Sequence, residues 1–376
     1  MHQVRSWRRV GLGSAIVALV FAAACGSIGN SASDAGAGGA GVSSSSSSSG
    51  VGGMSGDAGA DAEDSDGGLS LPACPSGAAR AFAMNQLFIG DSDADGTPNP
   101  ANGWKSFGFN LDGRLSTKTS TDLCKPKAGG SAAEVYPDGN VGIDNAFGKN
   151  ILPILLGLAA DVTTVNNESI KIGEYTYLLS LANADQNSCS TSSSFFLGAN
   201  MGDVPKFDGS DVWPLDASSL IDPMKPTSAK CKYADTMLEG GMVHAGPSSQ
   251  LDFILFVSGY KMVLPIRHAQ VDFVLEPNLR GIKGGQIGGI IRTDELVKEF
   301  ARVMGAFDAS LCDAQSPTVK TILEQFRQAS DIMQDGTQDP TKECDGISIG
   351  LGFTMKPVRL GAIALAAPPL PNPCVP

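Results

Sequence analysis

The stretch 251-LDFILFVSGYKMVLPIRHAQVDFVLE-276 decides the fold of this chain. It opens with an apolar and aromatic run from Leu251 to Ser258, and Ser258-Gly259 supplies a turn signal. Alternation of apolar with other residues follows, which places one side of a strand in a core. The alternating apolar positions are Tyr260, Met262, Leu264 and Ile266, then Val271, Phe273 and Leu275. The stretch therefore predicts a meander of three antiparallel strands.

Further strand and helix signals lie on both sides of this meander. Apolar runs predict strands at 81–89, 104–111, 174–181, 194–197 and 347–355. Near the C-terminus, apolar residues recur at helical spacing after Thr293 and again after Ser316-Pro317, which are typical helix starts. Because strands are many and helices collect late, the expected class is β-rich α+β. We expect an antiparallel β-sandwich-like domain with a few helices, two of them near the C-terminus.

The charge balance limits the possible partners. The chain has 376 residues, with 27 Lys and Arg against 39 Asp and Glu, for a net charge of −12. A surface this acidic repels phosphate backbones, so nucleic-acid binding is largely excluded. Only three histidines occur, which excludes most His-rich zinc chemistry.

The N-terminus has the composition of a secretory signal peptide. Residues 1–24 combine three arginines with a short apolar run that ends in small residues. The junction Ala22-Ala23-Ala24-Cys25 resembles a bacterial lipobox, in which the cysteine becomes the lipidated first residue of the mature chain. The resemblance implies a lipid on Cys25 and a membrane as partner. Ordinary cleavage after Ala24, which would leave Cys25 as a plain thiol, is the alternative.

A tether and a single domain follow the leader. Residues 25–72 are almost entirely Gly, Ser, Ala and Asp, with an unbroken serine run at 43–49. Such a segment cannot bury enough apolar surface to offset its ordering entropy, so we expect it to be disordered. Residues 73–376 are expected to form one globular β-rich domain.

The eight cysteines are widely spaced and indicate disulfides in a secreted chain. We predict that Cys312 and Cys344 pair, because they bracket the helix that starts at Ser316. Whether the number of cysteines is odd or even depends on the fate of Cys25. If Cys25 carries lipid, seven cysteines remain and one is unpaired, whereas without lipid all eight could pair.

The stretch 87-LFIGDS-92 resembles the nucleophile block of GDSL-type esterases, in which a strand delivers a catalytic serine. That family also needs an aspartate three residues before a histidine near the C-terminus. Neither His244 nor His268 is preceded in this way, and the Gly-x-Asn-Asp block is absent. Ser92 is therefore left without a recognisable base, and no catalytic residue is assigned.

An overlapping pattern suggests a cation site. Asp91, Asp93, Asp95 and Gly96 read D-x-D-x-D-G, which resembles the front half of an EF-hand-type calcium loop. The twelfth position is Asn102 instead of a bidentate Glu, so other oxygens would complete the shell. Candidates for these are Asp112, Asp138, Asp144 and Asn145. The alternative is an acidic loop whose Asp and Gly residues serve turn geometry. We predict calcium at Asp91, Asp93 and Asp95.

Leader, tether and disulfide-bearing domain together resemble the uncharacterised secreted lipoproteins of Gram-negative soil bacteria. The resemblance covers the architecture and implies a cell-envelope protein anchored in the outer membrane, but no activity. We therefore expect a surface-tethered, non-enzymatic binding or structural domain with a protein or glycan ligand and with calcium as a stabilising cofactor. The alternative is a secreted hydrolase acting on esters or glycans.

Overall fold

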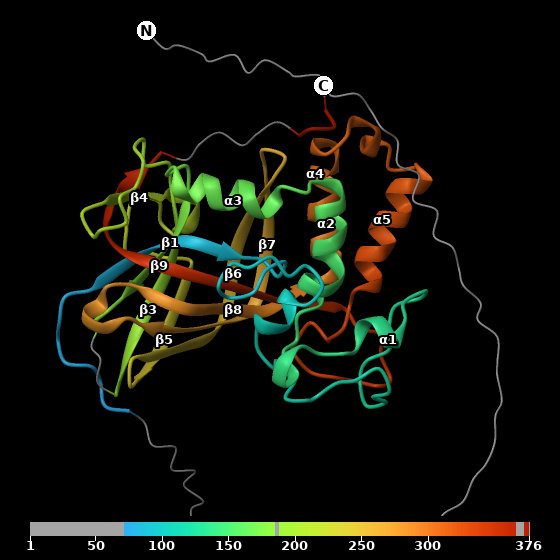
Figure 1. The fold of residues 1–376 in the computed structure, drawn as a ribbon, viewed down its shortest axis with the longest axis horizontal. Coiled ribbons are helices and arrows are strands. Elements are labelled where there is room, and N and C mark those ends of the chain that lie inside the picture. Colours follow the sequence, from blue (N-terminus) through green and yellow to red (C-terminus); the bar gives the residue numbers. More distant parts are fainter. Residues whose placement is uncertain (1–70, 185–187, 366–371, 376) are drawn as a thin grey trace, which may run out of the picture. The chain divides into compact units, whose positions relative to one another are not determined.

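The strands form one closed sheet. The computed structural model describes residues 71–184, 188–365 and 372–375, which fall in one compact unit. Eight strands pair with antiparallel neighbours, and the last also pairs with the first, so that the sheet closes into a barrel (Figure 1). In order around the barrel they are β1 (Arg80–Phe88), β2 (Thr176–Leu181), β3 (Cys189–Gly198), β5 (Cys231–Glu239), β6 (Met242–Val257), β7 (Tyr260–Leu275), β8 (Ile282–Arg292) and β9 (Gly346–Ala364).

The β-rich class with a few helices is confirmed, and the arrangement is a barrel instead of the expected sandwich-like form. The closing element is β9, which pairs with β8 on one edge and with β1 on the other. Closure leaves fewer free strand edges than two stacked open sheets would. Apolar side chains from all eight strands and from the neighbouring helices join in one continuous core.

The predicted three-stranded meander is a hairpin of two long strands. β6 and β7 each have 16 residues, and they join at Ser258-Gly259, where the turn was expected. The expected break between Ile266 and Val271 is wrong. His268 has a φ of 50° and lies where the register with both neighbouring strands shifts, so β7 continues through a bulge.

One short strand lies outside the ring. β4 (Val212–Asp216) runs parallel to the end of β9 and touches the end of β3. It covers the outer face of the barrel with a second apolar cluster, whose buried members are Ala83, Leu178, Phe196, Trp213, Leu215, Leu220, Ala229 and Val358. In this region both faces of the sheet are therefore buried.

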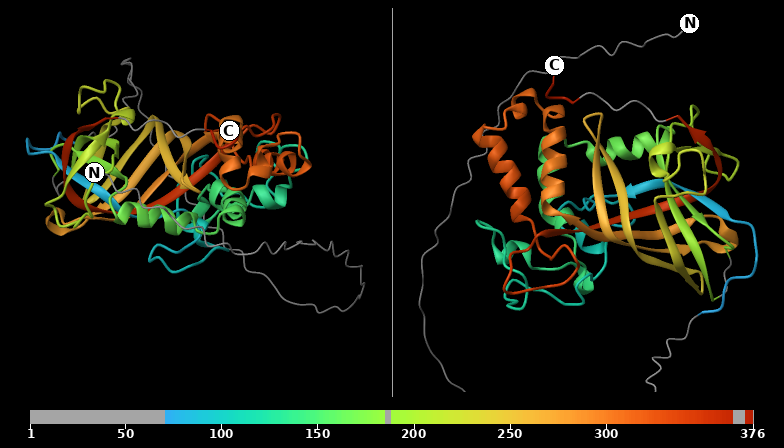
Figure 2. Two further views of the ribbon diagram at one scale, coloured as in Figure 1. Left: turned by 90° about the horizontal axis from the view of Figure 1, so that it is seen from above. Right: turned by 180° about the vertical axis from the view of Figure 1, so that it is seen from behind.

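The helices pack on the outside of the barrel (Figure 2). Those of the described residues are α1 (Ala132–Val135), α2 (Leu152–Leu158), α3 (Val162–Lys171), α4 (Thr293–Val303) and α5 (Pro317–Gln328), with a π turn at Phe147–Ile151 and 3-10 turns at Gly103–Ser106, Asn140–Gly142, Ala217–Ser219, Pro277–Leu279, Met304–Ala306 and Ala309–Cys312. The two helices predicted near the C-terminus are confirmed. They pack through Phe300 and Phe326, whose rings stack at 4.1 Å.

Three disulfides cross-link the domain, and the predicted Cys312–Cys344 pair is wrong. Its two members pair elsewhere, in Cys312–Cys374 and Cys124–Cys344, and the third bridge is Cys74–Cys189. The physical reason is position in the fold. Cys344 stands just before β9, beside the loop that carries Cys124, and Lys125 bridges to Glu343 there. The three bridges indicate an oxidising compartment.

Candidate functional site

The barrel wall has a gap between β3 and β6. β5 pairs with β3 from Cys231 onward, but it pairs with β6 only at Met242–Ala245. From Ser248 to Val257, β6 is paired with β7 alone. The free edge of β6 at 250–256 thus faces the end of β3 at 196–198, and no strand of the described residues lies between them. We term this gap the seam.

Side chains satisfy part of the free β6 edge. The phenol of Tyr177 accepts from the Ile254 N–H and donates to its C=O. At Phe256, two residues further along β6, the amide of Asn166 forms the two main-chain hydrogen bonds that a neighbouring strand would form. Its Nδ2 donates to the Phe256 C=O at 2.8 Å, and its Oδ1 accepts from the Phe256 N–H at 2.9 Å. Within the described part of the chain, no side chain does the same at Asp252, so the edge stays open there.

The free edge of β7 is covered in a similar way from α4. Glu299 accepts from the Val263 N–H at 2.7 Å, and Arg302 donates to the Lys261 C=O. Exposed strand edges invite pairing with other chains, and natural proteins protect them. Side chains from neighbouring elements thus protect the hairpin on both edges, except at the level of Asp252.

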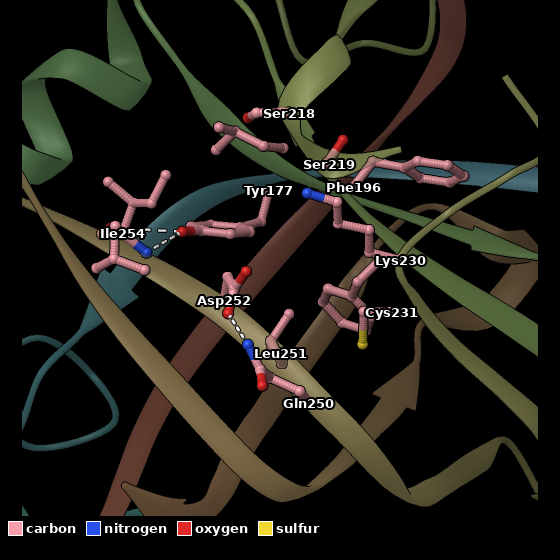
Figure 3. Close-up of a pocket in the computed structure, with 13 residues that line it drawn as sticks. Tyr177, Phe196, Ser218, Ser219, Lys230, Cys231, Gln250, Leu251, Asp252 and Ile254 are labelled. Carbon is pink, nitrogen blue, oxygen red and sulfur yellow. Dashed lines mark hydrogen bonds between the residues drawn. The ribbon is translucent and has the colours of Figure 1, made fainter. Parts of the chain in front are cut away.

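A pocket of about 370 Å³ lies at this opening (Figure 3). Its lining is apolar and aromatic with several polar groups, and consists of Tyr177, Phe195, Phe196, Leu197, Ser218, Ser219, Lys230, Cys231, Gln250, Leu251, Asp252, Ile254 and Val263. A second hollow of about 390 Å³ shares Leu197 and Ile254 with it, so the two adjoin along the seam. Concave sites of this size and character suit small molecules.

Two charged side chains of opposite sign line the pocket. Lys230 stands just before β5, and Asp252 lies on β6, so they come from different walls (Figure 3). Asp252 accepts a hydrogen bond from Gln250. Burial raises the pKa of the Tyr177 phenol and of the Cys231 thiol, and the nearby charge of Asp252 adds to both shifts. Asp252 itself is exposed, so its carboxylate lies at the mouth of the pocket within electrostatic reach of both groups.

The unpaired cysteine of the described residues is Cys231, which belongs to this pocket. It is only 5% exposed, and its Sγ lies 3.8 Å from Ser248 Oγ. The buried hydroxyl of Tyr233 has no hydrogen-bond partner within the described residues. Because the raised pKa keeps the thiol protonated, Cys231 is a poor nucleophile at neutral pH.

The structure does not bring the predicted calcium ligands together. Asp91 accepts from the Thr163 hydroxyl at 2.5 Å, Asp93 from the Asn99 amide at 2.8 Å, and Asp95 from the Thr97 N–H at 2.8 Å. Among the residues that the structure describes, no three His, Cys, Asp or Glu side chains are arranged to hold a metal ion. One buried oxygen, Asp91 Oδ1, lacks a hydrogen-bond partner there. Calcium at this loop stays a prediction.

The esterase motif is also not assembled with a base. Ser92 is buried in the loop after β1, where its main chain bridges to Pro98. His244 Nδ1 lies 2.8 Å from Asp272 Oδ2 on the outer face of the barrel, and His268 is exposed at the bulge of β7. Within the described ranges, no hydroxyl or thiol is hydrogen-bonded to either histidine. Cys25, the predicted lipidation site, lies outside the described residues.

A cluster of one buried and two half-buried acids was only partly predicted from the sequence. Asp138, Asp144 and Asp331 each accept hydrogen bonds from loop or strand N–H groups, from Ser116, Leu111 and Ser348 respectively. Burial raises the pKa of Asp138 to about 6, of Asp144 to about 9 and of Asp331 to about 7, and repulsion from neighbouring carboxyls, Asp112 among them, adds to these shifts. These acids hold loops together and line none of the pockets described above.

The seam pocket was missed by sequence reasoning. Its residues are spread from Tyr177 to Val263 over several elements, and no local spacing connects them. The nearest signal is the apolar run that starts at Leu251, which predicts a strand and gives no indication of a pocket.

None of the helices within 71–184, 188–365 and 372–375 has the length and apolar character of a membrane-spanning segment. No protein-family model, curated protein or solved structure matches this chain.

Proposed function

We propose that residues 73–376 are a non-enzymatic binding domain that holds a small amphipathic molecule in the seam pocket. The observation that supports this proposal is the pocket itself, where apolar and aromatic walls surround a few polar groups at a break in strand pairing. An apolar concavity with a few polar groups is the arrangement that small-molecule sites favour. The alternative of a hydrolase acting on esters or glycans gains no observation of its own.

The proposal includes the envelope anchor. A signal peptide at 1–24, a lipid on Cys25 and the tether at 25–72 would hold the domain at the outer membrane. The cysteine count supports this arrangement. Six described cysteines form disulfides, and the seventh, Cys231, is buried in the barrel. An odd number of cysteines in the mature domain is thus compatible with lipid on Cys25.

The pocket is tested by filling it. Ile254 lines both hollows, so Ile254→Trp should weaken binding of the amphipathic dye 8-anilinonaphthalene-1-sulfonate about tenfold or more, because the larger ring occupies the site. The matched control is Ile221→Trp at a side chain that is 73% exposed, and it should bind as the wild type does. Calorimetry measures both. Equal affinity in the two variants would overturn the binding site.

The anchor is tested separately in cells that express the full chain. Cys25→Ala should move the protein from the membrane to the soluble fraction, whereas Ser27→Ala should leave it with the membrane. Mass spectrometry of the mature N-terminus should find acyl chains on Cys25. An unmodified Cys25 at the N-terminus would contradict the anchor and leave the pocket proposal unaffected.

A further inference from the structure

Two opposite charges line the seam pocket without neutralising each other. No ion pair of the described residues includes Lys230 or Asp252. Other charged side chains of the described residues do form ion pairs. Lys225, five residues before Lys230, pairs with Asp222 at 3.3 Å. Both residues are exposed at the mouth of the pocket, and one oxygen of Asp252 accepts from Gln250. The pocket therefore presents an ammonium and a second carboxylate oxygen that carry no ion pair and can bind a ligand.

Polar groups gather around each charge. Figure 3 shows Lys230 on the same side of the pocket as Ser218 and Ser219, and Asp252 beside Gln250 on the other side. The Ser219 hydroxyl already donates to the Asp216 C=O at 2.7 Å, so the donors left for a ligand on this side are the Lys230 ammonium and the Ser218 hydroxyl. An ammonium with a neighbouring hydroxyl is a natural partner for a carboxylate, because both groups can donate hydrogen bonds. A carboxylate in the same pocket selects a cation.

The open edge of β6 adds a main-chain hydrogen-bond acceptor beside the Asp252 carboxylate. Ile254 and Phe256 turn their N–H and C=O groups to the seam, where Tyr177 and Asn166 meet them. Residues two apart on a strand turn their main chain to the same edge, so both the C=O and the N–H of Asp252 face the seam as well. An ammonium group placed there would meet both the side-chain carboxylate and a main-chain acceptor.

We infer that the ligand of the seam pocket is a small zwitterion with an apolar body, the chemistry of an apolar α-amino acid. Its carboxylate lies beside Lys230 and its ammonium beside Asp252. Its side chain packs on the apolar wall, which includes Tyr177, Phe196 and Ile254. The inference rests on the proposed function and specifies the ligand class of the same site.

The first experiment removes one ligand charge at a time. Calorimetry on the full mature protein compares L-phenylalanine with 3-phenylpropionate, which lacks the ammonium, and with 2-phenylethylamine, which lacks the carboxylate. L-phenylalanine should bind at least about tenfold more tightly than either analogue, because each analogue leaves one pocket charge without a partner. An analogue that binds as tightly as L-phenylalanine would overturn the zwitterion.

The second experiment removes one protein charge at a time. Lys230→Gln should weaken L-phenylalanine and 3-phenylpropionate about tenfold and leave 2-phenylethylamine unchanged, whereas Asp252→Asn should weaken the two amines and spare 3-phenylpropionate. Matched controls are Lys232→Gln and Asp235→Asn, two exposed charges on β5 outside the pocket lining, which should change nothing. If both pocket variants weaken all three compounds equally, the assignment of each charge to a ligand group is wrong.

Failure of this inference can be told apart from failure of the proposed function. If the anilinonaphthalene dye binds and Ile254→Trp weakens it while L-phenylalanine does not bind, the pocket stands and the zwitterion is refuted. If Ile254→Trp leaves dye binding unchanged and L-phenylalanine does not bind, both proposals fail.

Discussion

The seam edge of β6 and the loops around the buried acids satisfy unpaired N–H groups with different kinds of side chain. At the seam, the neutral amide of Asn166 and the neutral phenol of Tyr177 bond the main chain of β6. In the loop region, the Asp144 carboxyl accepts the Leu111 N–H, and the Asp331 carboxyl accepts the Ser348 N–H at the start of β9. An amide can be buried without a charge, whereas a buried carboxyl holds its proton to higher pH. We therefore expect pH to act on the loops and to leave the seam unaffected.

The largest expected effect concerns the cross-link of the loop region. Cys124 and Cys344 are 220 residues apart in sequence. Replacing both by Ser should lower the free energy of unfolding by ~5 kcal/mol in the chain-entropy model, because the unfolded chain gains the freedom of a very long loop. Urea denaturation measures the loss.

The matched control for the cross-link is Cys231→Ser, which leaves all three bridges in place and should lose far less. Non-reducing peptide mapping should recover Cys124 with Cys344 and Cys312 with Cys374. A peptide that links Cys312 to Cys344 would contradict the connectivity described above.

The second largest expected effect is a loss of stability at the free edge of β6 in the seam. Asn166 is fully buried and bonds both main-chain groups of Phe256 as well as the Tyr175 hydroxyl. Asn166→Ala should cost about 3 kcal/mol of unfolding free energy, because buried donors and acceptors lose their partner. Thr164→Ala, at an exposed site of the same helix, is the control for helix propensity. Similar melting temperatures for the two variants would show that the amide does not hold the edge.

The pH dependence of the unfolding free energy tests the comparison between the seam and the loops. Burial raises the pKa of Asp144 to about 9 in the folded protein, whereas in the unfolded chain an aspartate has a pKa near 4. Unfolding then releases a proton, so the contribution is fully present below pH 4 and falls as pH rises toward 9. Between pH 7.5 and 8.5 the unfolding free energy should drop by about 1.4 kcal/mol per pH unit from this group. Asp144→Asn should remove that slope.

The loss caused by Asn166→Ala should, by contrast, be the same at pH 5.5 and at pH 8.5. A loss that varied with pH as strongly as the wild-type stability does would show that the two regions do not differ in the way proposed.

The smallest expected effect is that of calcium on the loop at Asp91, Asp93 and Asp95. At a tenfold excess over Kd, a site that forms only in the folded state adds ~1.4 kcal/mol. Thermal melting with added calcium and with chelator should differ for the wild type and not for Asp93→Asn. Magnesium should do less, because it requires octahedral geometry and keeps its water. Equal melting temperatures in all samples would leave the loop as an acidic turn.

Much of the secondary structure was predictable because its signals are local. Alternation identified the strands at Tyr260–Ile266 and Val271–Leu275, and helical spacing identified the two C-terminal helices. The predicted break between Ile266 and Val271 was wrong because of the bulge at His268. One residue of positive φ interrupts the alternation there without ending the strand. Of the candidate site, the sequence showed only separate pieces. Leu251 belonged to an apolar run, and Lys230 and Asp252 were two charges among many.

The sequence by itself determined the β-rich class, the hairpin turn, the late helices and the number of cysteines available for disulfides. Each of these depends on residues that are near neighbours in the chain or on composition. Tertiary structure alone decided that the sheet closes, which cysteines meet and where the wall opens. The seam exists because β5 stops pairing with β6 at Ala245 while β6 continues to Val257. Strand register sets that mismatch, and register depends on how all eight strands fit around one core.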